Sequence, residues 1–201
     1  MGYLATAIGY DANVSAASSY GTAIGYGTKA QHSSATAIGN GAVASGRNSM
    51  SLGTNATAQG GNTVAIGTQA NASAGHAIAL GTTTTASGKK SLAFGYSTSV
   101  SGGDSLAIGG VNTVAGSSTA VFGIHNTVAT NNTFVLGNDV TSTLPNSVYL
   151  GTSTATVTKG TAGTSTYDSE TIDGKTYNFA GGTPTGVVSV GNDNQTRRIQ
   201  G

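Results

Sequence analysis

The side chains of this chain that could act in acid–base chemistry are few and far apart. Asp11, Asp104 and Asp139 are the only carboxylates in the first 157 residues, and long stretches of sequence separate them. General acid–base catalysis needs partners within hydrogen-bond reach of one another. This spacing therefore predicts no enzymatic activity.

A metal site is not indicated either. The chain has no cysteine, and its three histidines, His32, His76 and His125, stand at different points of the repeat described below, so stacking the repeats would not bring them together. We expect isolated histidines at corners or on the surface, and neither a metal nor a cofactor.

The lysine pair Lys89-Lys90 stands in a context that superficially resembles a phosphate-binding loop. That loop requires G-x-x-x-x-G-K-[ST]. Here Thr83 replaces the first glycine, and Lys89 is followed by a second lysine instead of Ser or Thr. The motif is therefore rejected. The pair is expected to form a solvated corner that could contact an acidic ligand.

The composition excludes several classes of protein. The chain has 201 residues, 32 of them Gly, and only 7% are charged, whereas an ordinary soluble domain has about 25%. A net charge of +1 gives no electrostatic case for binding nucleic acid or an acidic membrane. No apolar run has the length of a membrane-spanning helix. Something other than a conventional globular core must order such a chain.

A repeat explains the order. A glycine preceded by a large apolar residue recurs eleven times; the first interval is 16 residues and the next nine are 14 each. Positions are counted below from this glycine, as position 0, and residues at one position in successive repeats form a column. The glycines are Gly9, Gly25, Gly39, Gly53, Gly67, Gly81, Gly95, Gly109, Gly123, Gly137 and Gly151.

Alternation within the repeat predicts two short strands per unit. Positions −3 and −1 share one face of a strand, and positions +3 and +5 share one face of the next. Large apolar residues fill −1 in every copy and −3 in most, with Thr6, Thr22 and Thr36 at −3 in the early copies, and Ala or Val fills most +5 positions. We expect all four positions to point inward. One such unit buries too little surface to fold alone, so stacked copies should form a parallel β-solenoid about 50 Å long.

Corners should join these strands. The glycine at position 0 supplies a positive φ at little steric cost, and a second corner seven residues later often uses glycine as well, as at Gly46, Gly60 and Gly88. Pro145 falls in a corner, where its missing N–H breaks no ladder.

On this assignment position −2 points outward, and its residues are small and apolar. An apolar stripe along a rod usually marks an interface, so this column is predicted to pack against other copies of the chain. The alternative is that alanine is merely tolerated on a surface. The predicted interface residues are Ala7, Ala23, Ala37, Ala65, Ala79, Ala93, Ala107, Val121, Val135 and Tyr149. The second strand has a polar outward column that includes Thr85, Thr113, Thr127 and Thr141.

The sequence motifs of these repeats resemble those in the head of the YadA-like trimeric autotransporter adhesins. Ser91-Leu-Ala-Phe-Gly95 and Ser105-Leu-Ala-Ile-Gly109 are similar to the family's S-x-A-I-G phrase, and Ala42-Val-Ala-Ser-Gly46 is similar to its A-x-A-x-G phrase. The resemblance covers residues 3 to about 157. It implies a left-handed parallel β-roll and a head made of three chains.

The C-terminal part resembles the family's neck, V-S-V-G-x-x-x-x-R-x-I. The matching residues are Val188, Val190, Gly191, Arg197, Arg198 and Ile199. The expected organisation is head repeats over 1–157, a head insert over 158–185 and a neck over 186–201 that leads to a coiled-coil stalk. Asp173-Gly174 within the insert predicts a β-hairpin.

The resemblance implies a non-enzymatic adhesin head on a bacterial surface, anchored to the outer membrane through a C-terminal region that this chain lacks. Its expected partners are two further copies of itself and a host surface, an extracellular-matrix protein or other bacteria, with no nucleic acid and no membrane insertion by the fragment. Two alternatives remain. One is an ice-binding β-solenoid, given the Thr column, and the other is an acyltransferase-like β-helix, whose hexapeptide period does not divide 14.

Overall fold

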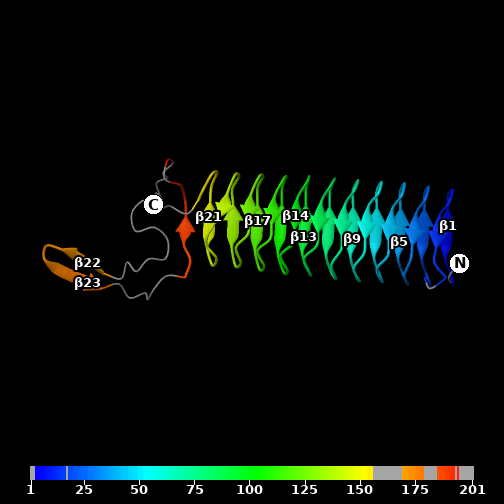
Figure 1. The fold of residues 1–201 in the computed structure, drawn as a ribbon, viewed down its shortest axis with the longest axis horizontal. Helices are drawn as coiled ribbons and strands as arrows, with labels where there is room; N and C mark the ends of the chain where they lie inside the picture. Colours follow the sequence, from blue (N-terminus) through cyan, green and yellow to red (C-terminus); the bar gives the residue numbers. More distant parts are fainter. Residues whose placement is uncertain (1–2, 17, 156–168, 179–184, 193, 195–201) are drawn as a thin grey trace.

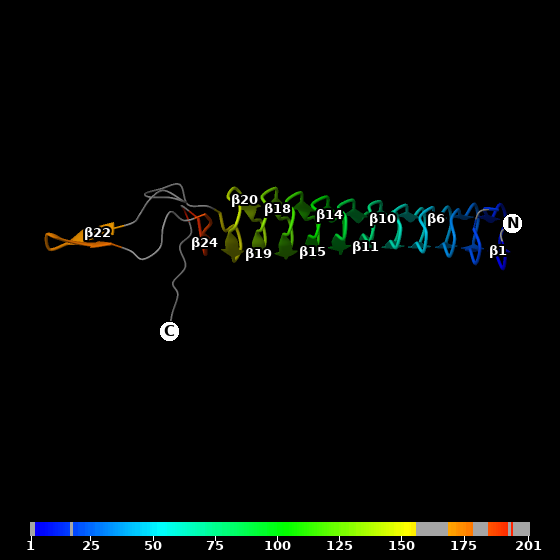
Figure 2. The ribbon, with the colours of Figure 1, turned by 90° about the horizontal axis from the view of Figure 1, so that it is seen from below.

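The computed structural model describes residues 3–16, 18–155, 169–178, 185–192 and 194. These residues form a rod of flat coils in which the chain advances along the long axis by one turn per repeat (Figure 1). Seen from below, the rod consists of two thin layers, one of odd-numbered and one of even-numbered strands (Figure 2). The described residues contain no helix long and apolar enough to cross a membrane.

The odd-numbered strands of the roll and β24, from the C-terminal part of the chain, form a 12-stranded sheet, here called the first sheet. Its strands, in order, are β1 Thr6–Ile8, β3 Thr22–Ile24, β5 Thr36–Ile38, β7 Met50–Leu52, β9 Val64–Ile66, β11 Ile78–Leu80, β13 Leu92–Phe94, β15 Leu106–Ile108, β17 Ala120–Phe122, β19 Phe134–Leu136, β21 Val148–Leu150 and β24 Val188–Ser189.

The even-numbered layer is a 10-stranded sheet, here called the second sheet. Its strands are β2 Asn13–Val14, β4 Lys29–Ala30, β6 Val43–Ala44, β8 Thr57–Ala58, β10 Asn71–Ala72, β12 Thr85–Ala86, β14 Ser99–Val100, β16 Thr113–Val114, β18 Thr127–Val128 and β20 Thr141–Ser142. A separate antiparallel pair consists of β22 Ser169–Ile172 and β23 Lys175–Asn178.

Every strand of the two large sheets pairs in parallel with its equivalent in the next turn. Ile78 pairs with Leu92 and Asn71 with Thr85, which is the 14-residue spacing of the sequence. Backbone bonds continue the ladder beyond the strands: the Thr22 N–H donates to the Ala35 carbonyl at 2.9 Å. The predicted parallel β-solenoid with 14-residue turns is thereby confirmed.

The core lies between the sheets and is made of small side chains. In the second sheet, the inward columns at +3 and +5 are as predicted: Ala70, Ala72 and Val100 are fully buried. In the first sheet, the predicted orientation is wrong. Position −2 is buried, as at Ala79 and Ala93, and the large residues at −3 and −1 lie on the outer surface.

The spacing between the layers explains this reversal. Period two shows only that −3 and −1 share a face, and a shift of one residue exchanges the two faces of a strand. Large side chains from both layers would not fit into the thin interior of a 14-residue turn, so the small column turns inward. The inward set of the first sheet is completed at −4, where Ser or Thr is usual, as at Thr63 and Ser91, and Ala occurs at Ala35 and Ala77.

The corners use two different properties of glycine. The glycines at position 0 have a positive φ, from 99° at Gly151 to 141° at Gly123, with Gly137 as the exception. The glycines of the second corner do not have a positive φ. A Cβ on Gly46 would instead collide with the Gly60 carbonyl of the next turn. The left-handed residues of that corner stand at −5 and include Asn48 and Lys90.

A segment far along the chain, β24, returns to the roll. β24 pairs in parallel with β21, Val188 beside Val148 and Ser189 beside Tyr149, so the Val-Ser-Val-Gly segment occupies the place of one more strand of the first sheet. The intervening sequence contains the β22–β23 hairpin at the predicted Asp173-Gly174 turn, beyond the β21 end of the roll (Figure 1).

Candidate binding surfaces

The outer side of the first sheet carries an apolar face, formed by the outward side chains at positions −3 and −1. Leu136 is 54% exposed, Phe94 48% and Met50 42%, although all three are large and apolar. The rings of Phe122 and Phe134, in neighbouring turns, lie 6.0 Å apart between centroids. The −1 column of this face is apolar in every turn from β1 to β21, whereas the −3 column begins with Thr6, Thr22 and Thr36.

The residues predicted to form an interface lie instead inside the chain. Ala23, Ala37, Ala65, Ala79, Ala93, Ala107, Val121, Val135 and Tyr149 are fully buried, and Ala7 in the first turn is half-buried against the same core. Their predicted outward orientation is therefore wrong. The column grows toward the C-terminal end, where the Tyr149 hydroxyl accepts from the N–H groups of Thr143 and Leu144 at 3.3 Å. The small size of this column from Ala7 to Ala107 was the available signal, because the space between the sheets in these turns is filled by small side chains.

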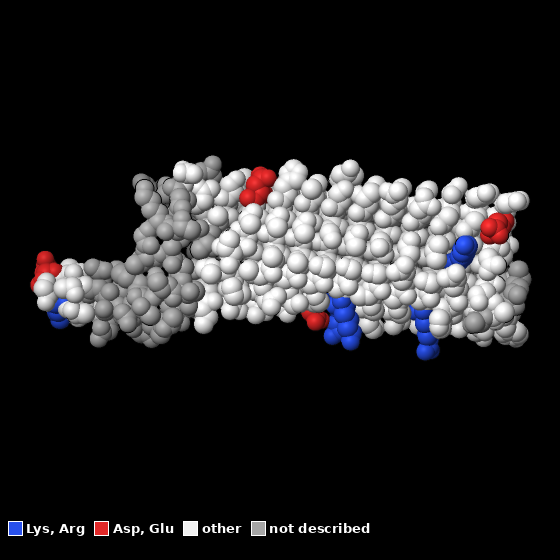
Figure 3. All heavy atoms as spheres, in the orientation of Figure 1, with Lys and Arg blue, Asp and Glu red and all other residues white. Residues whose placement is uncertain are grey.

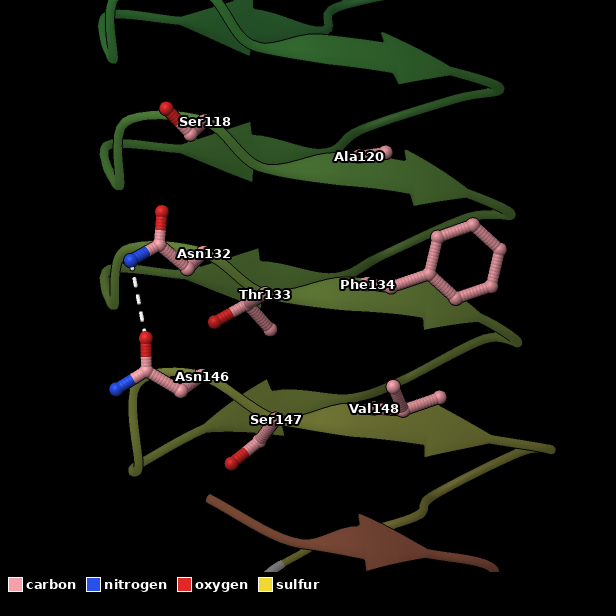
Figure 4. Close-up of a pocket in the computed structure, with 8 residues that line it drawn as sticks. All are labelled: Ser118, Ala120, Asn132, Thr133, Phe134, Asn146, Ser147 and Val148. Atoms are coloured by element: carbon pink, nitrogen blue, oxygen red, sulfur yellow. Dashed lines mark hydrogen bonds between the residues drawn. The ribbon is translucent and has the colours of Figure 1, made fainter. Parts of the chain in front are cut away.

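A shallow hollow of about 470 Å³ opens on the apolar face where Ala120 stands one turn before Phe134 (Figure 4). Its other lining residues come from the same three turns and include Asn132 and Asn146, whose side chains are joined at 3.0 Å. No titratable side chain lines it. The hollow is thus a gap in the apolar face and contains no chemistry of its own.

A ladder of buried polar side chains stands at position +3, and the sequence analysis did not identify it. Asn126 Nδ2 donates to Asn112 Oδ1 at 3.0 Å and to the Gly137 carbonyl at 2.9 Å. Thr84 uses its hydroxyl in the same way toward the Gly95 carbonyl at 2.8 Å. These bonds satisfy the carbonyls of the corner glycines inside the roll. The change from Ala to Thr and Asn along this column was the signal.

The outer side of the second sheet carries a polar face, formed by the side chains at +4 and +6. Asn13, Lys29, Thr113, Thr127 and Thr141 are exposed there. Thr57, Asn71, Thr85 and Ser99 are half-buried in the same column. The predicted polar outward column is confirmed.

The groups that could act in chemistry are scattered over the corners. Lys90 Nζ lies 3.6 Å from Asp104 Oδ1, and His125 Nδ1 lies 3.6 Å from Asp139 Oδ1, with all four side chains more than half exposed. His76 stands at −5 and His125 at +2, which are opposite corners of the turn. Within the described ranges, no group of three His, Cys, Asp or Glu residues is placed to hold a metal ion.

The predicted neck residues are described in part. Val188 is 70% exposed on the apolar face, Val190 is half-buried, and Gly191 is buried, with its carbonyl accepting from the Ala155 N–H at 3.0 Å. Ser189 is buried at the −2 position and donates to the Ala155 carbonyl at 2.6 Å. Arg197, Arg198 and Ile199 lie outside the described residues.

The two sheets, their 14-residue turns and their apolar face define a parallel β-solenoid repeat protein. The model of the YadA head domain repeat matches residues 2–28, 18–42, 44–70, 58–84 and 86–115, which together make up more than half of the chain. The chain therefore belongs to the YadA head family, the adhesin heads of trimeric autotransporters. Members of this family are generally non-enzymatic, surface-exposed and anchored to the outer membrane. Comparison with curated proteins finds no match.

Proposed function

We propose that this chain is the passenger head of a bacterial surface adhesin that attaches cells to a host surface, to extracellular-matrix protein or to other bacteria. The observation that carries the proposal is the apolar face of a rod whose repeats match the YadA head family. A monomer exposing such a face along its whole length would be prone to aggregate. We therefore propose that further copies of this chain cover the apolar face.

The proposed assembly is a homotrimer of left-handed rolls, with the number three and the handedness taken from the family. The interface we propose consists of the −3 and −1 columns, including Ile66, Leu80, Leu106 and Ile108, in place of the buried −2 column. Burying large aliphatic and aromatic side chains between chains would stabilise the head by roughly 25 cal/mol per Å² of apolar surface. The segment 158–185 is proposed as the head insert and 186–201 as the neck.

Adhesion is assigned to the surfaces that the trimer leaves outside. The polar face and the corners present Thr, Ser and Asn side chains in regular rows with few charges. A weak contact made by one chain is multiplied when three identical chains engage one surface together. No single strong pocket is required for attachment.

Two measurements test this proposal. The molar mass of the purified chain in solution should be three times 19.5 kDa, and a stable monomer would contradict the assembly. The trimer should also bind cultured cells or matrix-coated plates. Exchanging Thr113, Thr127 and Thr141 for Gln should weaken attachment, because it reshapes the polar face. The matched exchange of the exposed Thr54, Thr68 and Thr82 shows whether the corner at position 0 contributes to attachment as well. Unchanged attachment of the first variant would contradict the assignment to the polar face.

The ice-binding alternative depends on the same polar face. Lys29, Val43 and Asn71 interrupt its Thr column, so the face lacks the uniform row that this alternative needs. Thermal hysteresis in a freezing assay would reinstate it. Nothing in the structure favours it over the adhesin.

A further inference from the structure

One corner of the roll carries most of its positive charge. Backbone bonds establish the order of the turns along this corner: the Asn62 N–H donates to the Arg47 carbonyl at 2.8 Å, and the N–H of His76 to the Gly61 carbonyl at 3.0 Å. The N–H of Lys90 then donates to the Gly75 carbonyl at 3.0 Å. Residues 47, 61, 75 and 89 are thus stacked at position −6. Arg47 and Lys89 stand three turns apart, about 14 Å at the usual strand spacing.

The two glycines between these cations are not required by the fold. Neither Gly61 nor Gly75 has a positive φ, and a Cβ added to either would meet nothing closer than 3.9 Å. The same position holds Asn131 and Pro145 in later turns. Glycine here therefore leaves an open stretch of bare backbone between Arg47 and Lys89, of the kind that permits close approach of a ligand.

That stretch also offers hydrogen-bond donors. At the equivalent position near the C-terminal end, the Ser117 N–H donates to the Asn131 side-chain oxygen of the next turn at 2.9 Å. This bond shows that the backbone N–H at position −6 can donate to an oxygen that is not part of the backbone ladder. No described residue supplies an acceptor for the N–H groups of Gly61, Gly75 and Lys89. They are free to bind anionic oxygens.

The charges on this corner are only partly balanced. Asp104 pairs with Lys90, whereas Arg47 and Lys89 have no carboxylate within salt-bridge distance among the described residues. The other two carboxylates of the roll, Asp11 and Asp139, stand at +2 on the opposite corner. Charged side chains are sparse, and two of the blue groups on the rod lie along its lower edge, with a red group beside one of them (Figure 3). In a chain with 7% charged residues, such a cluster creates a local positive field.

We propose that this basic corner, formed by Arg47, Gly61, Gly75, Lys89 and Lys90, binds a sulfated polysaccharide laid along the rod. The cations bind separated sulfates, and the bare amides between them bind the anionic groups in the middle. A small anion would not reach both Arg47 and Lys89. Single-stranded nucleic acid is bound with its bases stacked on aromatic side chains, and positions −7 to −5 from His32 to Asp104 contain no Tyr, Phe or Trp. The proposal rests on the adhesin function, because such polysaccharides are extracellular.

The test uses heparin fragments and the purified full chain at physiological salt. The triple variant R47Q/K89Q/K90Q should bind about tenfold more weakly, since three exposed charge contacts are lost. The variant K29Q, which removes an exposed lysine on the polar face, is the matched control and should bind like the parent. Binding should also fall as salt rises.

A second variant tests the backbone amides without changing charge. Asn131 caps the N–H of the residue 14 positions before it, so asparagine at residues 61 and 75 should cap the N–H groups of residues 47 and 61. G61N/G75N should therefore bind heparin about threefold more weakly. Its thermal melting should match that of the parent. Loss of binding in both corner variants supports the proposal. Unchanged binding in either of them, an equal loss in K29Q, or binding of single-stranded DNA as tight as that of heparin overturns it.

The adhesin function is tested separately by attachment to cells that have been treated to remove sulfated polysaccharide. If heparin does not bind but attachment persists, the basic corner is refuted and the adhesin stands. If heparin binds and attachment never occurs, the adhesin function fails and the corner stands.

Discussion

Val188 lies beside Val148 as its parallel partner, although every regular turn places such partners 14 residues apart. The chain therefore makes a long excursion between two neighbouring strands and returns in register. The Val148 N–H donates to the Val187 carbonyl at 2.7 Å, and the Val187 N–H donates to the Ser147 hydroxyl at 3.0 Å. The returning segment thus continues the ladder.

Gly186 is predicted to be essential for this return. A Cβ there would collide with the Asn146 carbonyl, so Gly186→Ala should separate β24 from β21. Hydrogen exchange at the Val148 amide should accelerate about tenfold while the preceding turns keep their protection. Gly61→Ala is the control, because its Cβ meets nothing closer than the Arg47 carbonyl at 3.9 Å, and it should leave exchange unchanged. Equal protection of Val148 in both variants would contradict the prediction.

Asn126 is predicted to be worth more to stability than its exposed counterparts. Asn126→Ala would leave the buried Val140 N–H and Gly137 carbonyl without partners, at a cost of about 2–4 kcal/mol. Asn126→Thr should recover part of this, because Thr84 and Thr98 bond the next glycine carbonyl from the same position. Denaturant unfolding measures both, with the exposed Asn40→Ala as control. A loss as small as that of Asn40→Ala would show that the ladder contributes nothing.

Ala79 and Leu80 are adjacent in β11, but substitutions at the two positions should affect different properties: the stability of the roll at Ala79 and the assembly of the trimer at Leu80. Ala79→Leu inserts three carbons between the close sheets and should cost about 1–3 kcal/mol in unfolding. Leu80→Asn alters only the apolar face, so it should weaken the trimer and leave the roll's circular dichroism unchanged. Mass measurement at decreasing concentration separates the two effects. If Ala79→Leu dissociated a folded trimer and Leu80→Asn did not, the alanine column would be the interface after all.

Asp104→Asn is predicted to change the affinity for heparin while leaving the free energy of unfolding almost unchanged. The Lys90–Asp104 pair is exposed, with side chains 61% and 64% accessible, so its loss should change the free energy of unfolding by less than about 0.5 kcal/mol. Heparin affinity should rise about twofold, because the carboxylate that pairs with Lys90 of the basic corner is removed. Asp139→Asn, which breaks the His125 pair on the opposite corner, is the control. A stronger effect of the control on affinity would argue against the corner.

Much of this architecture could be predicted from the sequence. The 14-residue spacing of Gly25 to Gly151 determined the turn length and the parallel pairing, because stacking equivalent positions is the only way for such short units to bury their inner faces. The polar outer column of the second strand and the hairpin at Asp173-Gly174 also followed from local chemistry. The return of Val188 to the sheet could not be predicted, because it depends on where a long excursion ends.

Which side of the first strand faces the core was decided by the tertiary structure, and the small size of the −2 column was its one trace in the sequence. Alternation in Ile78-Ala79-Leu80 places Ala79 opposite its neighbours but does not say which side is inside. The distance between the two sheets settles that question: it admits Ala79 opposite the small residues of the second sheet and leaves Ile78 and Leu80 outside. Large apolar residues, normally the mark of a core, here form the outer face of the roll, because a 14-residue turn encloses too little space to hold them.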